Sequence, residues 1–377
     1  MAAPPRPAPT PCSTAEIEAL GRELGLAAVG VATADPLLRA RQALEHRRAI
    51  GLDGGMAFTY KNPERSTTPT AAVRGARSII VGARSYLIDE PEPAEPVGRR
   101  SAPLARVARY AWVDHYAPLK AALWGVAHHL RAAGWKAVAF ADDNSIVDRE
   151  AAWLAGVGWF GKNANLLLPR AGSWFVLGSV ITDAPLEPNA TPVADGCGSC
   201  RRCLDACPTA AIVAPGTIDA NRCLAWLLQK PGVFPVEHRI ALGDRIYGCD
   251  DCQDVCPPTV RFAPSSPAIG TPTPTVPVLE LLGATDAELL ARYGRWYLHD
   301  REPRWLRRNA LIVLGNTGDG CDEAVAAALA EYLGHPDPIL RAHAVWAAAR
   351  LLRHDLLPDT DRDTIVCAEL HAVRGTL

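Results

Sequence analysis

The cysteines of this chain are concentrated in one short segment. Of the 11 cysteines, eight lie between Cys197 and Cys256, and only Cys12, Cys321 and Cys367 lie outside. In a reducing compartment, a group of this kind binds metal more often than it forms disulfides. We therefore expect this segment to fold around a metal centre, with the three remaining cysteines as free thiols.

The spacing of the eight cysteines follows the bacterial ferredoxin pattern. Residues 197–208 read C-x2-C-x2-C-x3-C-P, in which three thiolates hold one [4Fe–4S] cluster and the fourth reaches a second cluster. Residues 249–257 read C-x2-C-x3-C-P and lack one early cysteine, which Cys223 can supply. The spacing predicts one cluster on Cys197, Cys200, Cys203 and Cys256, and another on Cys207, Cys223, Cys249 and Cys252.

Zinc is the main alternative to iron and sulfur. Soft thiolates select either centre, and two zinc sites of four thiolates each would also use eight cysteines. Zinc ribbons, however, use separated C-x2-C pairs rather than one continuous run. The pattern therefore favours two [4Fe–4S] clusters, with zinc and disulfides as the remaining alternatives.

Length and composition limit the class of protein. At 377 residues and 40.3 kDa the chain exceeds what one core usually supports, so two or three domains are expected. A net charge of −2 excludes a basic field over the whole protein, but not a local basic face. No apolar run reaches the roughly 18 residues that a membrane span needs. Residues 1–14 are proline-rich and lack an apolar signal-peptide core, which predicts a disordered tail and a cytoplasmic protein.

The chain before the cysteines alternates between strand-like and helix-like patterns. Ser13 and Glu16 have the spacing of a capping box, and Tyr116–Ala133 carries apolar residues at helical intervals. Four short runs predict strands, at 27–32, 78–83, 136–141 and 174–182. We therefore expect a mixed α/β domain over 15–190, with 89–103 as a surface loop, followed by a ferredoxin-like domain over 191–262.

The chain after the cysteines changes character. Residues 263–283 begin with a proline-rich stretch and predict a linker. Residues 305–311 recur loosely as 339–345, and each copy forms an apolar helix face after a proline-containing turn. This recurrence predicts a small module of paired helices over 284–377, of the TPR or HEAT kind.

A group of carboxylates follows the third predicted strand. Asp142 and Asp143 come directly after it, and Asp148 follows a few residues later. Carboxylates at a strand end are well placed for acid–base chemistry, although a solvated turn with helix-capping aspartates fits this spacing too. The glycines at 156–161 match neither a P-loop nor a dinucleotide fingerprint.

Several motifs together resemble the epoxyqueuosine reductases. They are C-G-S-C-x2-C-L-D-A-C-P-T-x-A-I at 197–212, I-Y-G-C-D-D-C-Q-x-V-C-P at 246–257, A-G-V-G-W-F-G-K-N at 155–163, G-S-W-F-x-L-G at 172–178, and G-M…N-P-E-R at 55–65. The resemblance covers about residues 15–377. Such enzymes use cobalamin and two [4Fe–4S] clusters to remove the epoxide oxygen of epoxyqueuosine at the tRNA wobble position. The reductive dehalogenases share this plan.

The resemblance implies a fold, partners and site residues. It implies a multidomain α+β protein with a mixed α/β corrinoid-binding domain, a two-cluster ferredoxin-like domain and C-terminal HEAT-like helical repeats. The implied partners are a tRNA anticodon stem-loop and an external low-potential electron donor, with the protein as a monomer and away from membranes. Asp142 takes the role of proton donor. The residues implied around cobalamin are Arg65, Asp142, Lys162, Asn163, Leu166, Ser173, Asp250 and Asp251.

The chain departs from the family pattern mainly near the substrate. Where the family usually has R-Y-A-x-G-x-D-Y-H, this chain has R-Y-A-W-V-D-H-Y-A at 109–117. The segment 225–230 differs from the family as well, and the usual C-P-W-N is replaced by C-P-P-T at 256–259. Ser179 stands where the family has a glutamate. Two other functions therefore stay open. One is a related corrinoid reductase acting on a small, for example halogenated, molecule, and the other is a ferredoxin-type electron carrier.

A strip of arginines is the candidate RNA surface. Arg301, Arg304, Arg307 and Arg308 flank Trp305, and Arg341 recurs in the next copy of the repeat. Such a strip could bind phosphates while the tryptophan stacks on a base. A solvated helix face with a buried tryptophan is the equally weighted alternative.

Overall fold

A computed structural model describes residues 9–89, 103–188, 191–262 and 270–375. Contacts between residues divide the chain into two compact units, each assembled from three segments. Unit 1 comprises Met1–Asp89, Asp114–Asn221 and Asp251–Ile269, and unit 2 comprises Glu90–Val113, Arg222–Asp250 and Gly270–Leu377. The predicted division into successive domains along the sequence stays a prediction.

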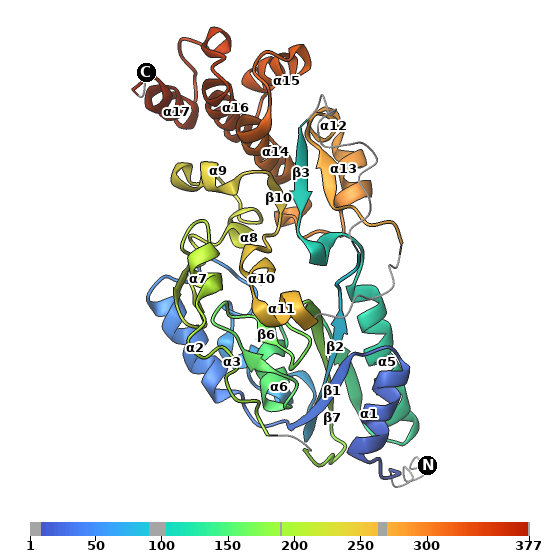
Figure 1. Cartoon of the computed structure of the whole chain (residues 1–377). Helices are drawn as coiled ribbons and strands as arrows, with labels where there is room; N and C mark the ends of the chain where they lie inside the picture. Colours follow the sequence, from blue (N-terminus) through green and yellow to red (C-terminus); the bar gives the residue numbers. More distant parts are fainter. Residues whose placement is uncertain (1–8, 90–102, 189–190, 263–269, 376–377) are drawn as a thin grey trace. The chain divides into compact units, whose positions relative to one another are not determined.

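An antiparallel sheet of four strands forms the centre of unit 1 (Figure 1). The strand order is β1 (Ala28–Thr33), β2 (Ser78–Ser85), β7 (Phe175–Thr182) and β4 (Ala137–Phe140). These strands coincide, within a few residues, with the four apolar runs in the sequence. Because nearly every residue of β2 is buried, helices must cover both faces of the sheet.

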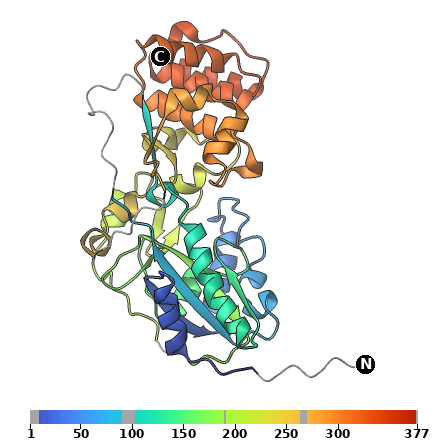
Figure 2. The same cartoon turned by 90° about the vertical axis from the view of Figure 1, so that its right-hand side faces the viewer.

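Alternation along the strands separates the two faces. Ile79, Val81 and Ala83 belong to one buried cluster with residues of α6 (Asp148–Leu154). On the opposite face, a Cβ added at Gly82 would lie 3.1 Å from Leu123 in α5 (Tyr116–Ala132). The predicted helix at 116–133 is thus confirmed. It packs on the sheet beside α1 (Thr14–Glu23) (Figure 2).

The start of the described chain is ordered against unit 1. The Thr10 amide donates to the Ala133 carbonyl at 2.8 Å, and the Trp135 indole donates to the Thr10 carbonyl at 2.9 Å. The predicted capping box of Ser13 and Glu16 is confirmed, with the Ser13 amide 2.8 Å from Glu16 Oε2. The predicted disordered tail is therefore wrong for residues 9–14, and its remainder lies outside the described residues.

Short elements complete unit 1. They are α2 (Leu38–Ala49), α3 (Pro63–Ser66), α4 (Pro69–Ala72), β5 (Trp159–Phe160), β6 (Leu166–Leu167), α7 (Arg202–Ala206), β8 (Ile212–Ala214), β9 (Thr217–Ile218), α10 (Asp251–Asp254) and α11 (Pro257–Phe262). β5 pairs with β6 and β8 with β9, both antiparallel. Most of the predicted surface loop at 89–103 lies outside the described residues.

Unit 2 combines a small sheet with helices. Its three strands are ordered β10 (Arg245–Tyr247), β3 (Leu104–Val107) and β11 (Thr275–Pro277). The predicted linker at 263–283 is therefore wrong in its second half, because β11 pairs with β3 and α12 (Val278–Gly283) follows directly. The other helices are η1 (Arg109–Ala111), α8 (Leu224–Leu227), α9 (Val236–Leu242), α13 (Asp286–Tyr293), η2 (His299–Arg301), α14 (Arg304–Thr317), α15 (Glu323–Leu333), α16 (Pro338–Arg350), η3 (His354–Leu356) and α17 (Thr364–Arg374).

The two copies of the recurring sequence lie on α14 and α16. These helices pack on each other, with α15 and α17 packed against α16. Their contact is tight, since a Cβ at Gly315 in α14 would lie 2.7 Å from the Trp346 ring. Among the described residues, no helix has the length and apolar character needed to cross a membrane.

A buried arginine joins α14 to the segment after α8. Arg308 is 1% exposed, and its guanidinium donates to the carbonyl oxygens of Leu227, Leu228, Lys230 and Gly232 at 2.6–3.2 Å. Burial lowers the Arg308 pKa to about 9, with a further contribution from Arg239. One side chain thus binds four carbonyls of this segment, of which the Leu228 carbonyl also accepts from Asn309 Nδ2 at 2.9 Å.

We expect Arg308→Met to lower the free energy of unfolding by at least about 3 kcal/mol, because four carbonyls would lose a charged donor, two of them in buried hydrogen bonds. Arg292→Met is the matched control, since its side chain is 53% exposed and lies 3.9 Å from Glu280. That variant should change stability by less than about 1 kcal/mol. Chemical denaturation followed by circular dichroism measures both, and equal effects would contradict the structural role of Arg308.

Candidate functional site

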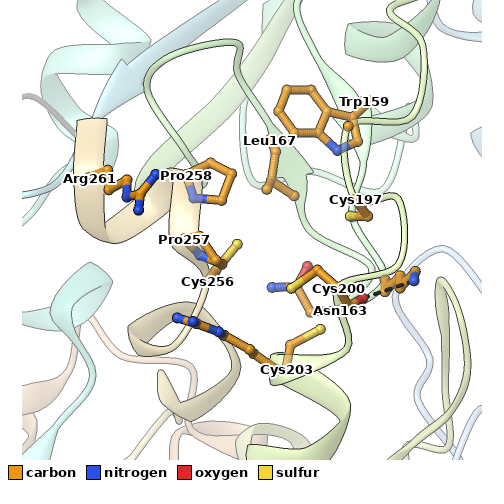
Figure 3. A pocket seen from close by; sticks show the side chains of 14 residues that line it. Trp159, Asn163, Leu167, Cys197, Cys200, Cys203, Cys256, Pro257, Pro258 and Arg261 are labelled. Carbon is orange, nitrogen blue, oxygen red and sulfur yellow. Dashed lines mark hydrogen bonds between the residues drawn. The ribbon is translucent and has the colours of Figure 1, made fainter.

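Four cysteines of unit 1 surround one cavity. Cys197, Cys200, Cys203 and Cys256 line a space of about 250 Å³, and their sulfurs face one another across it (Figure 3). The first two precede α7, the third lies within α7, and the fourth lies between α10 and α11. The structure therefore brings together the four cysteines that spacing assigned to the first cluster.

The Cys203 thiol resists ionisation in the absence of a cation. Burial raises the Cys203 pKa, and the charges of Cys256, Cys197 and Cys200 raise it further. Four thiolates held this close repel one another, so a positively charged centre must offset the repulsion. Soft sulfur donors around a cavity of this size fit a [4Fe–4S] cluster. None of the 11 cysteines, all within the described residues, forms a disulfide.

Lys162 and Asn163 support the cysteine loops. The Lys162 ammonium donates to the carbonyl oxygens of Gly198 and Cys200 at 2.7 and 2.8 Å. The buried Asn163 amide donates to the Cys252 carbonyl at 3.3 Å. Both residues also line the cavity. Their contacts hold the backbone that presents the sulfurs, while their predicted contact with cobalamin stays a prediction.

Ser173 belongs to a buried polar network. Its hydroxyl lies 3.1 Å from Thr259 Oγ1 and 3.0 Å from Gln253 Nε2, which also donates to Tyr86 Oη at 2.9 Å. The network links the loop before β7 to α10 and α11, on either side of Cys256. Leu166, in β6, is 4% exposed and packs in the core shared with α6.

The other predicted positions belong to different parts of the chain. Arg65 lies in α3 with an exposed side chain, and Asp251 begins α10. Asp250, in unit 2, accepts a hydrogen bond from the Arg109 amide at 2.7 Å. Arg109 begins the segment 109–117, which departs from the family pattern. Of the second cysteine set, Cys207 and Cys252 belong to unit 1 and Cys223 and Cys249 to unit 2. This ligand set stays a prediction.

Asp142 lies on a strained turn directly after β4. Its φ of 54° is in the left-handed region, which is uncommon for a residue other than glycine. The side chain is exposed, yet partial desolvation raises the Asp142 pKa, an effect that Lys120 opposes and Asp143 reinforces. A carboxyl that is both accessible and more readily protonated can donate a proton to a ligand.

Asp148 and Ser179 form a second acidic feature that the sequence analysis missed. Ser179 pairs with Val81 in the sheet and so faces α6, whose first residue is Asp148. The Ser179 hydroxyl donates to Asp148 Oδ1 at 2.9 Å. Burial raises the Asp148 pKa to about 7, and the charges of Asp142 and Asp143 add to the increase. In the sequence, Asp148 belongs to the group of carboxylates and Ser179 replaces a glutamate of the family pattern, but nothing joins the two residues because they lie 31 positions apart.

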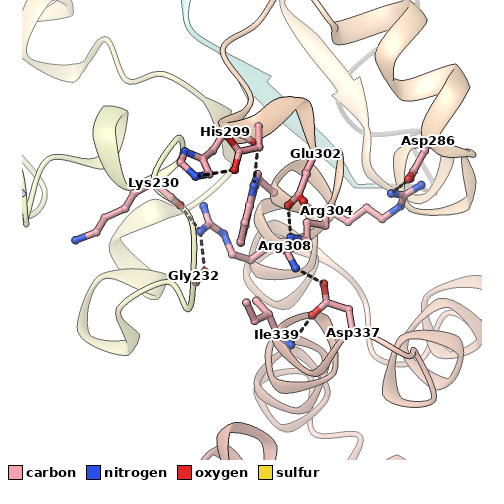
Figure 4. A network of polar contacts seen from close by, with 12 residues as sticks. Lys230, Gly232, Asp286, His299, Glu302, Arg304, Arg308, Asp337 and Ile339 are labelled. Atoms are coloured by element: carbon pink, nitrogen blue, oxygen red, sulfur yellow. Dashed lines mark hydrogen bonds and ion pairs between the residues drawn. The ribbon is translucent and has the colours of Figure 1, made fainter. Parts of the chain in front are cut away.

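The predicted arginine strip is wrong for two of its members. Arg308 is buried, as described above, and Arg341 is 5% exposed and bound to Asp361 at 2.8 Å (Figure 4 shows Arg308 and its neighbours). Arg304 lies 2.6 Å from Glu302 and 3.4 Å from Asp337, and Arg307 pairs with Asp286. Trp305 is buried as well. Arg301, Arg304 and Arg307 line one cavity of unit 2, so the predicted strip is contradicted only at Arg308 and Arg341.

Comparisons with known proteins agree with the site. Residues 196–259 match the family model described as a 4Fe-4S double cluster binding domain. An epoxyqueuosine reductase from Xanthomonas campestris pv. campestris is 35% identical, over 92% of this chain and 98% of the relative.

Solved structures extend the similarity to the whole fold. A crystal structure of epoxyqueuosine reductase with an epoxyqueuosine-modified tRNA-Tyr stem loop matches with a TM-score of 0.87 at 28% identity, covering 95% of this chain and 97% of that one. A structure of epoxyqueuosine reductase from Bacillus subtilis matches with a TM-score of 0.86 at 28% identity, covering 96% of this chain and 98% of that one. In that structure, the catalytic loop that carries an aspartate is swung out of the active site.

The raised Asp148 pKa predicts a pH-dependent stability. The folded protein holds this proton up to about pH 7, whereas the ordinary value is 3.8, so the free energy of unfolding should fall as the pH rises between these values. The loss is at most about 4 kcal/mol. The Asp148→Asn side chain is neutral at every pH, so this variant should lose this part of the pH dependence of the unfolding free energy. Compared with the natural chain, its stability should therefore be more favourable at pH 8 than at pH 4.

Ser179→Ala is the companion variant. It removes the hydroxyl that favours the ionised carboxylate, so the pH-dependent step should move upward. Chemical denaturation between pH 4 and pH 8 measures all three proteins. If the unfolding free energy of Asp148→Asn varied with pH in parallel with that of the natural chain, the raised pKa of Asp148 would be refuted.

Proposed function

The chain belongs to the epoxyqueuosine reductase family, and we propose that it reduces epoxyqueuosine to queuosine at the wobble position of tRNA. It is an oxidoreductase with a 4Fe-4S double cluster binding domain. The single observation that carries the proposal is the convergence of Cys197, Cys200, Cys203 and Cys256 on one cavity, within a chain similar to such enzymes along nearly its whole length.

The reaction requires two electrons and two protons. Both bonds from carbon to the epoxide oxygen break, a carbon–carbon double bond forms, and the oxygen leaves as water. An external low-potential donor would supply the electrons through the clusters. The protons must come from groups of the protein or from solvent near the substrate.

Asp142 is the proposed proton donor. Its side chain is accessible on the turn after β4, and its raised pKa keeps more of it protonated near neutral pH. Positioned acids typically contribute on the order of 10²–10⁴-fold to a rate. The strained turn fixes the backbone from which this side chain projects.

Two kinds of cofactor are proposed, with unequal support. The first-cluster cysteines, which line one cavity, are proposed to hold one [4Fe–4S] cluster, and the remaining four are proposed to hold the second. For cobalamin the fit is partial. Arg65 and Asp142 expose their side chains, whereas Asn163, Leu166 and Ser173 are buried and engaged within the protein. When bound, cobalamin would supply a cobalt centre that passes electrons to the epoxide carbons.

The remaining assignments concern the surroundings of the reaction. The substrate is proposed to be the anticodon stem-loop of a tRNA, in line with the solved relative bound to a modified stem loop. The paired helices α14–α17 are proposed to be HEAT-like repeats, and the α/β sheet of unit 1 to be the corrinoid-binding domain. The protein is proposed to act in the cytoplasm as a monomer.

Turnover under anaerobic conditions tests the proposal directly. The full-length protein would be reconstituted with iron, sulfide and cobalamin and given epoxyqueuosine-containing tRNA with a low-potential reductant. We expect queuosine, detected by mass spectrometry of the digested tRNA. Bound iron and cobalt without queuosine would favour a related reductase for small molecules, and iron without cobalt would favour an electron carrier.

Asp142→Asn should keep both clusters and lower turnover by about 10²–10⁴-fold, because the amide cannot donate the acid proton. Asp143→Asn is the matched control on the same turn, where Asp143 Oδ1 accepts from the Ser145 amide at 2.7 Å. The turnover of Asp143→Asn should stay within about tenfold of that of the natural chain. Unchanged turnover of Asp142→Asn would end its assignment as the acid.

Cys203→Ser should lose one cluster, so that the iron content falls from eight toward four per chain. Cys321→Ser is the control, because Cys321 is exposed and distant in sequence from the ligand segment. It should retain eight irons. Iron analysis and the absorbance of the reconstituted proteins measure both, and full iron content in Cys203→Ser would contradict the ligand assignment.

A further inference from the structure

The cavity of the first cysteine set contains a buried donor that the reaction scheme does not use. Trp159, in β5, is 7% exposed, and its indole Nε1 has no hydrogen-bond partner among the described residues. Burying an N–H group without an acceptor is unfavourable. Buried N–H groups in folded proteins normally have a hydrogen-bond acceptor. Where the protein supplies none, a bound group at the site can supply it.

The ring of Trp159 is fixed by its neighbours. Trp159 pairs with Leu167 across the β5–β6 hairpin. A Cβ added at Gly196 would lie 2.8 Å from the ring, so the backbone directly before Cys197 packs flat against the indole. The ring therefore cannot turn away without moving the loop that carries the first cysteine.

The indole nitrogen faces the sulfur of Cys197. Figure 3 shows it on the edge of the ring that is directed toward this cysteine, in the wall of the cavity. The indole N–H therefore lies beside a sulfur that accepts hydrogen bonds more readily once it carries the charge of a thiolate.

A sulfur bound to iron carries more negative charge than a thiol and accepts hydrogen bonds better. Hydrogen bonds to cluster sulfurs stabilise the reduced cluster, which bears one more electron, and so raise its reduction potential. We propose that the indole N–H of Trp159 donates to the Cys197 sulfur and raises the reduction potential of the cluster bound by Cys197, Cys200, Cys203 and Cys256. This inference rests on the proposed iron–sulfur assignment of that cavity, but not on tRNA or cobalamin.

Trp159→Phe removes the N–H and keeps an aromatic ring. In the reconstituted protein, electron paramagnetic resonance during an anaerobic redox titration should show one of the two clusters becoming harder to reduce. We expect a change of about tenfold in the reduction equilibrium, which corresponds to about 59 mV for one electron. The potential of the other cluster should stay unchanged.

Trp153→Phe is the matched control. Trp153 lies in the same unit, and its ring stacks against the Arg39 guanidinium at 3.9 Å rather than against a cysteine. This variant should leave both potentials unchanged. Unaltered potentials in Trp159→Phe with full iron content, or an equal change in both variants, would overturn the proposal.

A second measurement needs no variant. In the natural chain labelled with ¹⁵N at the tryptophan indoles, the reduced cluster should show a ¹⁵N hyperfine coupling, because the N–H···S contact places that nitrogen one hydrogen bond from the cluster. Absence of the coupling would overturn the proposal even if Trp159→Phe failed to fold. Since neither measurement uses tRNA, failed turnover with epoxyqueuosine would leave this result intact, whereas a chain that binds no iron would overturn both proposals.

Discussion

Electrostatic repulsion among four closely placed, partly buried cysteine sulfurs is the constraint on which this part of the chain depends. The helices that present the first cysteine set, α7, α10 and α11, have only four to six residues each, too few to be stable alone. Their order must come from Lys162, Asn163, the Ser173 network and the metal centre itself. A bound cluster would add to this order, since the free energy of binding also orders the ligand loops.

The sheet of unit 1 has the opposite character. Helices cover both faces, β2 is almost wholly buried and most residues of β1 and β7 are buried too, so apolar packing explains the order of the sheet. The turn after β4 carries Asp142 away from this rigid frame, and α6 begins with Asp148 beneath it. The acidic residues thus occupy a position defined by a preformed core, which keeps a strained turn in place at a modest energetic cost.

Local patterns predicted much of this organisation, and contacts between distant residues explain most of the failures. The spacing of Cys197, Cys200 and Cys203 is a property of a few consecutive residues, and so is the capping box at Ser13. Arg308, in contrast, resembled a surface residue because its carbonyl partners lie about 80 positions earlier. The strand β11 was taken for linker because its partner β3 is far away in the sequence. Burial, pairing and altered acidity all depend on such partners.

The interleaved course of the chain affects how this protein could be divided or inherited. The chain passes between the two units after Asp89, Val113, Asn221, Asp250 and Ile269, so no single cut yields one intact unit. The matched segment 196–259 also crosses these boundaries and leaves Trp159 and Lys162 behind. The segment 196–259 matches a complete cluster-binding domain. It could nevertheless not be exchanged with that of another protein unless the residues packed around it were exchanged as well.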